Sequence, residues 1–297
     1  MTTFVAIGCS SWRDYNCLAP LTALFWRDVI SLTPIVITVG DWDAPARPKI
    51  ALDALFYHRI LNVGIASVYG YEEPNVAQNV RQHSAALAYM KPDDWMMPSD
   101  ADLWPLRRDF YHLHEKTENI KAVCLYANGD HFQGKEVTLT KAAAGTPYQT
   151  LPTCHVVMRV ADWRERYGLV AGESIGLATK RTLDVWLKPK QEGKDASGAS
   201  WEAWMSDQRI LTEKLCRADW FPREVVMVER EGHPPKDRID RSLWPDTIDF
   251  ARMTDAHLLR EPDSPANWAK LRPLVAHFLP QHLEWADDYI TRYRASY

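Results

Sequence analysis

Two carboxylates separated by one residue follow an apolar run in the first third of the chain. Asp100 and Asp102 come directly after the run Trp-Met-Met-Pro-Ser at residues 95–99. In an extended segment side chains alternate between two faces, so both carboxylates project to the same side, at the point where a strand gives way to a turn. Carboxylate oxygens grouped in this way are suited to a divalent cation.

The segments before this pair alternate between strand and helix patterns. Apolar, β-branched runs predict strands at residues 4–8, 35–39, 63–69 and 95–99. Helical spacing of apolar residues predicts helices at residues 18–32, 49–61 and 75–90. We therefore expect an α/β fold with a doubly wound mixed sheet, mostly parallel and flanked by helices. Ligands of such sheets bind at the carboxyl ends of the strands, which is where Asp100 and Asp102 lie.

The remainder of the chain predicts further elements. Helices are expected at residues 106–116, 179–187 and 201–216, strands at 121–126, 155–160 and 225–228, and two C-terminal helices at 266–278 and 281–293. The Pro- and charge-rich residues 232–241 and the polar residues 128–130 are expected to form loops. Residues 188–198 are rich in Lys, Gly and Ser and are expected to be flexible.

The composition narrows the class of protein. The chain has 297 residues, 46% hydrophobic and 25% charged, with a formal net charge of -4, so it can bury a large core and lacks the basic stripe of a general nucleic-acid binder. Its five cysteines are scattered and form no C-x-x-C pair, which favours a reducing, cytoplasmic setting. No apolar run is long enough for a membrane span. The 13 tryptophans provide aromatic faces that suit sugar rings and nucleobases.

The Asp100-x-Asp102 pair after a fourth strand resembles the D-x-D motif of the GT-A-fold glycosyltransferases. In that family the motif holds Mn²⁺ or Mg²⁺ against the diphosphate of a nucleotide-sugar. The resemblance implies one GT-A-like catalytic domain over residues 1–297, with a nucleotide-binding half at 1–104 and an acceptor-side half, including the C-terminal helices, at 105–297. It also implies a hexosyl- or pentosyltransferase that moves a sugar from a nucleotide-sugar, with a UDP-sugar as the expected donor, to a hydroxyl of a glycan or glycoconjugate.

The resemblance further implies a third metal ligand from near the C-terminus. Many retaining GT-A enzymes use a histidine there, and His257 stands in a segment that we expect to be a loop. Imidazole is an acceptable ligand for Mn²⁺. The chain holds ten histidines, so His155 and His233 remain alternatives for this role, and a surface or capping role for His257 remains open as well.

Donor-binding residues are expected around the same edge of the sheet. Arg81 lies on the helix before the D-x-D strand, where similar enzymes place a basic residue against the diphosphate or the donor sugar; a solvated surface arginine is the alternative. The turn after the first strand is in the family's nucleoside-binding position. Asp41, in a second D-x-D after the second strand, is expected to contact the nucleoside and not the metal. The expected donor-binding residues are Gly8, Cys9, Ser10, Asp41, Arg81, Asp100, Ala101 and Asp102.

A late Asp-Gln pair at residues 207–208 resembles the carboxylate-bearing motif of several GT-A families. Such a carboxylate deprotonates the acceptor hydroxyl in an inverting enzyme, or contacts the donor sugar near the anomeric carbon in a retaining one. Asp207 is therefore the expected catalytic residue, with Glu202 and Glu173 as alternatives. The run Arg-Ile-Asp-Arg at residues 238–241 is interpreted as a salt-bridged loop, and a phosphate or sugar contact is the alternative.

Two other functions remain open. A nucleotidyltransferase that acts on a sugar phosphate also pairs carboxylates with a metal on an α/β sheet, although residues 8–11 lack the glycine-rich, basic loop typical of that class. A carbohydrate-binding protein without turnover would use the tryptophans. No complete P-loop, G-x-G-x-x-G or H-E-x-x-H motif occurs in the sequence, so NTPase, dehydrogenase and zincin functions lack support.

Overall fold

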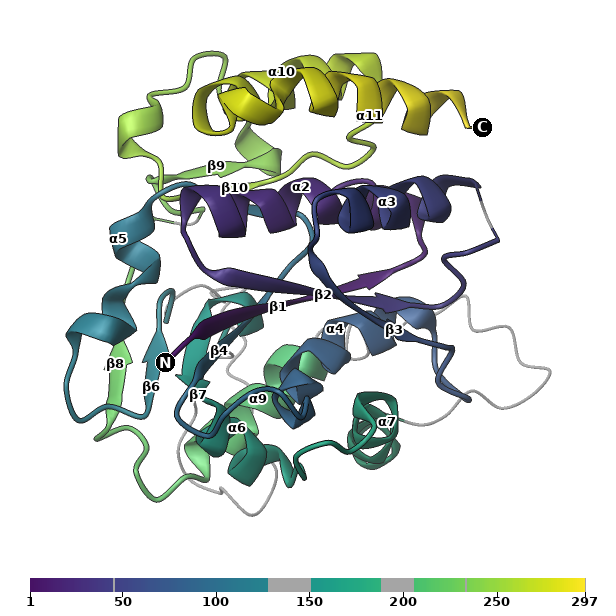
Figure 1. Cartoon of the computed structure of the whole chain (residues 1–297). Coiled ribbons are helices and arrows are strands. Elements are labelled where there is room, and N and C mark those ends of the chain that lie inside the picture. Colours follow the sequence, from purple (N-terminus) through teal and green to yellow (C-terminus); the bar gives the residue numbers. More distant parts are fainter. Residues whose placement is uncertain (45, 128–150, 188–205, 233, 297) are drawn as a thin grey trace.

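A mixed seven-stranded sheet forms the centre of the computed structural model, which describes residues 1–44, 46–127, 151–187, 206–232 and 234–296 (Figure 1). The strands lie in the order β3-β2-β1-β4-β7-β6-β8. Their bounds are Thr3–Ser10 (β1), Thr33–Val39 (β2), Leu61–Ile65 (β3), Trp95–Ser99 (β4), Ala122–Cys124 (β6), Val156–Arg159 (β7) and Val225–Met227 (β8).

The strand directions confirm the predicted doubly wound mixed sheet, mostly parallel. β1 pairs in parallel with β2 and β4, and β2 pairs in parallel with β3. β7 runs antiparallel to both β4 and β6, whereas β8 is parallel to β6. The register places Ile7 of β1 opposite Ser99 of β4. Residues 8–10 of β1 therefore extend beside the turn that carries Asp100 and Asp102.

Helices cover both faces of this sheet (Figure 1). The α-helices of the described residues are α1 (Arg13–Asn16), α2 (Ala19–Leu24), α3 (Ala46–Tyr57), α4 (Glu73–His83), α5 (Arg108–Tyr111), α6 (Val160–Tyr167), α7 (Ile175–Trp186), α9 (Ser206–Cys216), α10 (Pro265–Phe278) and α11 (Leu283–Ala295). The two predicted C-terminal helices are thus present as α10 and α11.

The alternation of side chains along β1 builds two cores. Val5 and Ile7 are fully buried in the core beneath α2 and α3, and Phe4 and Ala6 pack on the opposite face beneath α4. α10 and α11 lie outside α2 and α3 as an additional layer, while α4, α6, α7 and α9 cover the other face (Figure 1). The hydrophobic effect thus fixes the sheet between two helical layers and leaves its carboxyl edge for the polar residues.

The helix predicted at residues 18–32 is present without a break over residues 19–29, where α2 continues directly into a π-helix at Phe25–Val29. The side chains of this segment bind the turn after β4: the Thr22 hydroxyl donates to the carbonyl of Ala101 (2.6 Å) and the Trp26 indole donates to the Ser99 hydroxyl (3.0 Å). These buried hydrogen bonds hold the turn between the two acids in place.

A second, three-stranded sheet was not expected from the sequence. It has the order β5-β10-β9 and consists of β5 (Leu103–Pro105), β9 (Arg238–Asp240) and β10 (Asp255–His257). The expectations of a loop throughout residues 232–241 and of a loop around His257 are therefore wrong. β5 starts directly after Asp102 and pairs antiparallel with β10, which pairs in parallel with β9. The second sheet thus continues from the D-x-D turn.

Several predicted features lie outside the described residues: the loop at 128–130, the segment at 188–198, the start of the helix at 201–205, Glu202 and His233. None of the helices in the described ranges combines the length and the apolar character that a membrane span requires.

A close approach between β1 and α4 generates a prediction about Gly8. A methyl group on Gly8 would overlap the backbone carbonyl of Ala77 on α4. We expect Gly8→Ala to lower the free energy of unfolding by about 1–3 kcal/mol, as measured by urea denaturation, because backbone atoms must move apart. Gly64→Ala on β3 is the matched control, since the nearest atom to its added methyl group is the Thr38 hydroxyl at 3.8 Å. Equal effects of the two substitutions would contradict the prediction.

Candidate functional site

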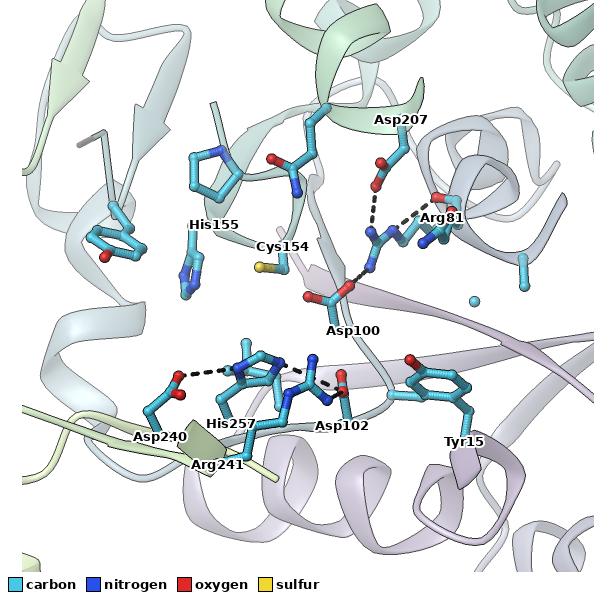
Figure 2. Close-up of a pocket in the computed structure, with 18 of the residues that line it drawn as sticks. Tyr15, Arg81, Asp100, Asp102, Cys154, His155, Asp207, Asp240, Arg241 and His257 are labelled. Atoms are coloured by element: carbon cyan, nitrogen blue, oxygen red, sulfur yellow. Dashed lines mark hydrogen bonds and ion pairs between the residues drawn. The ribbon is translucent and has the colours of Figure 1, made fainter. Parts of the chain in front are cut away.

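A pocket opens at the carboxyl edge of β1 and β4, where the two sheets meet (Figure 2). Side chains from both halves of the chain line it, including Asp100 and Asp102 after β4, Arg81 on α4 and Asp207 on α9. Its other wall carries His155 and residues of β9 and β10. The pocket therefore lies where doubly wound sheets bind their ligands.

Arg81 joins two acids across the pocket. Its guanidinium donates to Asp100 and, at 2.5 Å, to Asp207, while its Nε donates to the carbonyl of Gln78 at 2.9 Å (Figure 2). The Arg81 and Asp207 side chains are 5% and 3% exposed, whereas that of Asp100 is 36% exposed and faces the pocket. The position of Arg81 on α4 thus determines where both carboxylates lie.

Burial and this guanidinium set the charge states of the two acids. Burial in the pocket raises the pKa of Asp100, but the interaction with Arg81 outweighs it and holds that pKa well below its usual range. Burial raises the pKa of Asp207 above its ordinary value, although Arg81 favours the charged carboxylate. Asp100 is therefore the stronger acid of the pair, and Asp207 is the one whose proton affinity is increased.

Asp102 interacts with two cationic side chains from the second sheet and its flank. Arg241 Nη1 donates to Asp102 Oδ2 at 2.8 Å, and His257 Nε2 lies 3.6 Å from the same oxygen. His257 Nδ1 lies 3.1 Å from Asp240 Oδ2. Burial lowers the pKa of His257, but Asp102 and Asp240 outweigh burial and raise it to about 9. The imidazole is thus fixed between two carboxylates.

The pairing of β9 with β10 explains this arrangement. In their parallel register, Arg238 lies opposite Asp255 and Asp240 lies opposite His257. The residues between them, Ile239 and Ala256, are fully buried in the core. Because side chains alternate along a strand, both charged pairs lie on the same side of the second sheet, and Arg238, Asp240 and His257 line the pocket.

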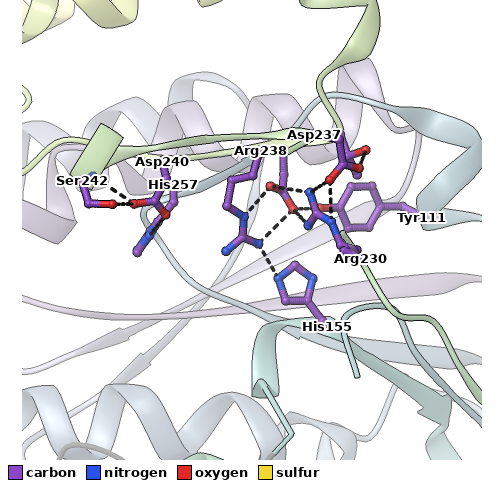
Figure 3. Close-up of polar contacts among 10 residues, drawn as sticks. Tyr111, His155, Arg230, Asp237, Arg238, Asp240, Ser242 and His257 are labelled. Atoms are coloured by element: carbon purple, nitrogen blue, oxygen red, sulfur yellow. Dashed lines mark hydrogen bonds and ion pairs between the residues drawn. The ribbon is translucent and has the colours of Figure 1, made fainter. Parts of the chain in front are cut away.

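Asp255 is the centre of a buried cluster behind the pocket wall (Figure 3). It is fully buried and accepts from Arg230 Nη1 at 2.6 Å and from Arg238 Nε at 2.7 Å. Arg238 Nη2 also donates to His155 Nε2 at 2.8 Å (Figure 3). A guanidinium can only donate, so this nitrogen of His155 must accept and its imidazole is neutral. Burial and the charge of Arg238 accordingly lower the pKa of His155 to about 3.

The pocket brings together most of the residues expected from the sequence. These are Gly8, Ser10, Arg81, Asp100, Ala101, Asp102, Asp207 and His257. Cys9 does not line it, because its side chain lies on the opposite face of β1, is 1% exposed and donates to the carbonyl of Ser10. Asp41 also lies outside the lining, in an exposed turn where it accepts from the backbone N–H of Asp43. Glu173 pairs with Arg181 away from the pocket.

Sequence reasoning missed several lining residues. They are Tyr15, Gln78, Cys154 and Arg260. Asp240 and Arg241 were interpreted as part of a salt-bridged loop, but their partners His257 and Asp102 were not predicted. The usable signal was the alternation Arg-x-Asp at 238–240 and Asp-x-His at 255–257, whose charges are complementary in register. Arg260 offered no such signal, and it forms no ion pair within the part of the chain that the structure describes.

The donor atoms near the D-x-D turn have the chemistry of a divalent-cation site, although no cluster of three or more His, Cys, Asp or Glu side chains in the described ranges is arranged to hold a metal. The carboxylates of Asp100 and Asp102 form ion pairs with Arg81 and Arg241, respectively. His257 has one nitrogen on Asp240, which leaves its other nitrogen beside Asp102. Metal-binding histidines commonly have such a carboxylate on the second nitrogen.

Comparison with known proteins supports the fold. No family model and no curated protein matches the chain. Among solved structures it is similar to the galactosyltransferase LgtC in complex with donor and acceptor sugar analogues, with a TM-score of 0.50 and 11% identity over 94% of this chain and 96% of that one. An active-site variant of LgtC gives the same values. The bifunctional glycosyltransferase WbbM is similar with a TM-score of 0.52 and 10% identity over 98% of this chain, which spans 51% of that chain. These likenesses show that the chain has the GT-A fold.

The neutral, buried His155 generates a prediction about acid stability. The unfolded chain takes up a proton on this histidine near pH 6.5, whereas the folded protein does so only near pH 3. Stability is therefore lost as the pH falls through this window, by about 1.4 kcal/mol per pH unit for one proton. We expect His155→Gln to reduce the pH dependence of the free energy of unfolding between pH 6 and 4 by about one proton. An unchanged slope would show that His155 is already protonated in the folded state.

Proposed function

We propose that the chain is a metal-dependent glycosyltransferase that moves a sugar from a nucleotide-sugar, with a UDP-sugar as the expected donor, to a hydroxyl of a glycan or glycoconjugate. One observation carries this proposal: Asp100 and Asp102 share a pocket with His257 and with the Arg81–Asp207 pair, at the carboxyl edge of a GT-A sheet. The likeness to a galactosyltransferase bound to donor and acceptor sugar analogues supports a hexosyl donor.

The two halves of the chain contribute different residues to the pocket lining, and we assign them different roles. Gly8, Ser10 and the D-x-D turn come from the first 104 residues, to which we assign nucleotide binding. His155, Asp207 and β9 come from the rest of the chain, to which we assign the acceptor side of one catalytic domain. The scattered cysteines favour a cytoplasmic setting for the reaction.

Asp100, Asp102 and His257 would hold a Mn²⁺ or Mg²⁺ ion, whose charge stabilises the diphosphate that leaves the donor. Asp240 fixes the His257 ring through Nδ1, so that Nε2 remains directed toward Asp102. Arg81 and Arg241 already lie against the two carboxylates, and their planar guanidinium groups are suited to phosphate oxygens. The same side chains therefore balance the acids and bind the diphosphate.

Asp207 acts at the anomeric centre. Its carboxylate is held beside the donor site by Arg81 and has a raised pKa. In an inverting reaction it takes the proton of the acceptor hydroxyl, for which a raised proton affinity is an advantage. In a retaining reaction it stabilises the positive charge that develops near the anomeric carbon.

Donor binding is the first test of this proposal. We expect UDP together with Mn²⁺ to raise the melting temperature of the wild-type protein, and UDP with a chelator to raise it far less, because the diphosphate needs the cation. Asp102→Asn should abolish the Mn²⁺-dependent part of the shift. Asp43→Asn is the matched control, since it lies in the other D-x-D, outside the pocket.

Other outcomes of this measurement separate the alternative functions. A preference for nucleoside triphosphates would indicate a nucleotidyltransferase, and stabilisation by free glycan alone would indicate a carbohydrate-binding protein. Full sugar transfer by the wild type in chelator, or by the Asp100→Ala, Asp102→Ala double variant, would rule out the metal-dependent mechanism.

The role of Asp240 can be tested separately. Loss of the carboxylate on Nδ1 frees the His257 ring to rotate, so we expect Asp240→Asn to weaken Mn²⁺ binding by roughly 10–100-fold in a titration followed by calorimetry. Asp246→Asn, at an exposed position outside the pocket, is the control. Unchanged affinity in Asp240→Asn would show that His257 is not a ligand or that Asp240 does not orient it.

A further inference from the structure

Arg238 presents one guanidinium nitrogen to the pocket while its other nitrogens are occupied. Nε and Nη2 donate to the two oxygens of Asp255, at 2.7 Å and 3.0 Å, and Nη2 also donates to His155 at 2.8 Å. Nη1 has no partner among the described residues, and Arg238 lines the pocket. In Figure 3 the nitrogen without a dashed line lies on the side of the guanidinium where Asp240 and His257 are found.

The surroundings hold this group rigidly. The Arg238 side chain is 11% exposed, and its guanidinium carbon lies 5.2 Å from the centre of the Tyr126 ring. His155 reaches it from the segment just before β7, and Asp255 reaches it from the neighbouring strand. A donor that is fixed in advance loses little entropy when it binds a ligand. Nη1 is therefore an ordered donor and not a mobile surface arginine.

The carboxylates that balance Arg238 and Arg230 lie outside the pocket lining. The two guanidinium groups share Asp255, and Arg230 also pairs with Asp237. The nearest acid on the same strand, Asp240, interacts with His257 instead. No carboxylate among the described residues pairs with Arg238 Nη1, so an incoming carboxylate or phosphate oxygen would complete the hydrogen bonding of this guanidinium.

We propose that Arg238, held by His155 and Asp255, forms a subsite for an anionic group, carboxylate or phosphate, on the acceptor. This rests on the proposed function, which already engages Arg81 and Arg241 with the diphosphate of the donor. Arg238 lies instead on the wall that also contains Tyr126, Cys154 and His155, all from the half of the chain assigned to the acceptor. Arg238 is therefore a specificity-determining residue that selects acidic or phosphorylated sugars over neutral ones.

The test measures binding of matched sugars with the donor site filled by UDP and Mn²⁺. The pairs are methyl glucuronide against methyl glucoside, and glucose 6-phosphate against glucose. The affinity of each sugar is measured by ligand-observed NMR titration. We expect the wild type to bind at least one anionic member about tenfold or more tightly than its neutral counterpart, as one added charge-assisted hydrogen bond provides. A preference for the anionic sugar in the first pair alone identifies a carboxylate subsite, and in the second pair alone a phosphate subsite. A preference in both pairs identifies a general anion subsite.

Two variants separate the subsite from the stability of the cluster. Arg238→Gln should abolish the preference for the anionic sugar. Arg230→Gln removes the other guanidinium that binds Asp255, and because Arg230 lies outside the pocket, this variant should retain the preference. If Arg238→Gln does not fold, His155→Phe tests the same point, because it removes an acceptor that orients the guanidinium and should reduce the preference.

Three results would overturn the inference. They are equal binding or no binding within both pairs, a preference that survives in Arg238→Gln, and a preference that is seen without nucleotide but lost when UDP and Mn²⁺ fill the donor site, which would assign Arg238 to the donor. Failure of UDP and Mn²⁺ to bind at all would contradict the proposed function instead. The same sugar pairs measured without nucleotide would then still report on Arg238.

Discussion

One buried guanidinium, that of Arg81, allows acids from separate parts of the chain to lie side by side. Without it, Asp100 and Asp207 would repel each other in a partly dry pocket, and one of them would be protonated. Removing one member of such a buried ion pair is strongly destabilising, because the partner charge remains buried without compensation. The location of Arg81 in turn depends on α4, which approaches β1 closely only because residue 8 is a glycine. A close backbone contact between β1 and α4 therefore sets the position of the guanidinium that balances the acids of the pocket.

The second sheet forms the opposite wall of the pocket, and there short strands, not a helix, position the charged side chains. Its strands are only three residues long, and each contributes alternate residues to the core and to the pocket. Ile239 and Ala256 anchor β9 and β10 in the same core as residues of α10 and α11, and this burial holds the charged neighbours on either side. Side chains of this wall whose ion pairs are complete are held rigidly. A donor without a partner in the described residues is available to bind a ligand. The orientation of His257 and the free nitrogen of Arg238 are two results of the same strand register.

The part of the architecture that depends on long, periodic segments could be predicted from the sequence. β4 was predicted at its observed bounds because it is a continuous apolar run, and the alternation of elements before it placed Asp100 and Asp102 at the correct edge. The fold of β9 and β10 could not be predicted, because three residues are too few for periodicity to be distinguished from chance. The side-chain orientation of Cys9 was also predictable: with side chains alternating along β1, it does not face the same way as Gly8 and Ser10. The roles of Asp207 and His257 came from resemblance, since nothing local to their sequence brings them to the D-x-D turn.

The ion pair between Arg241 and Asp102 joins residues separated by 139 positions, and β10 lies between them in the second sheet. Contacts of such sequence separation form late in folding, because a long stretch of chain must be ordered before they are gained. During synthesis Asp102 is therefore made well before its partners Arg241 and His257, whereas Arg81, the partner of Asp100, precedes the turn. The Asp102 carboxylate must remain solvated, or engage other cations, until the second sheet forms. The pocket is therefore complete only when almost the whole described chain has folded.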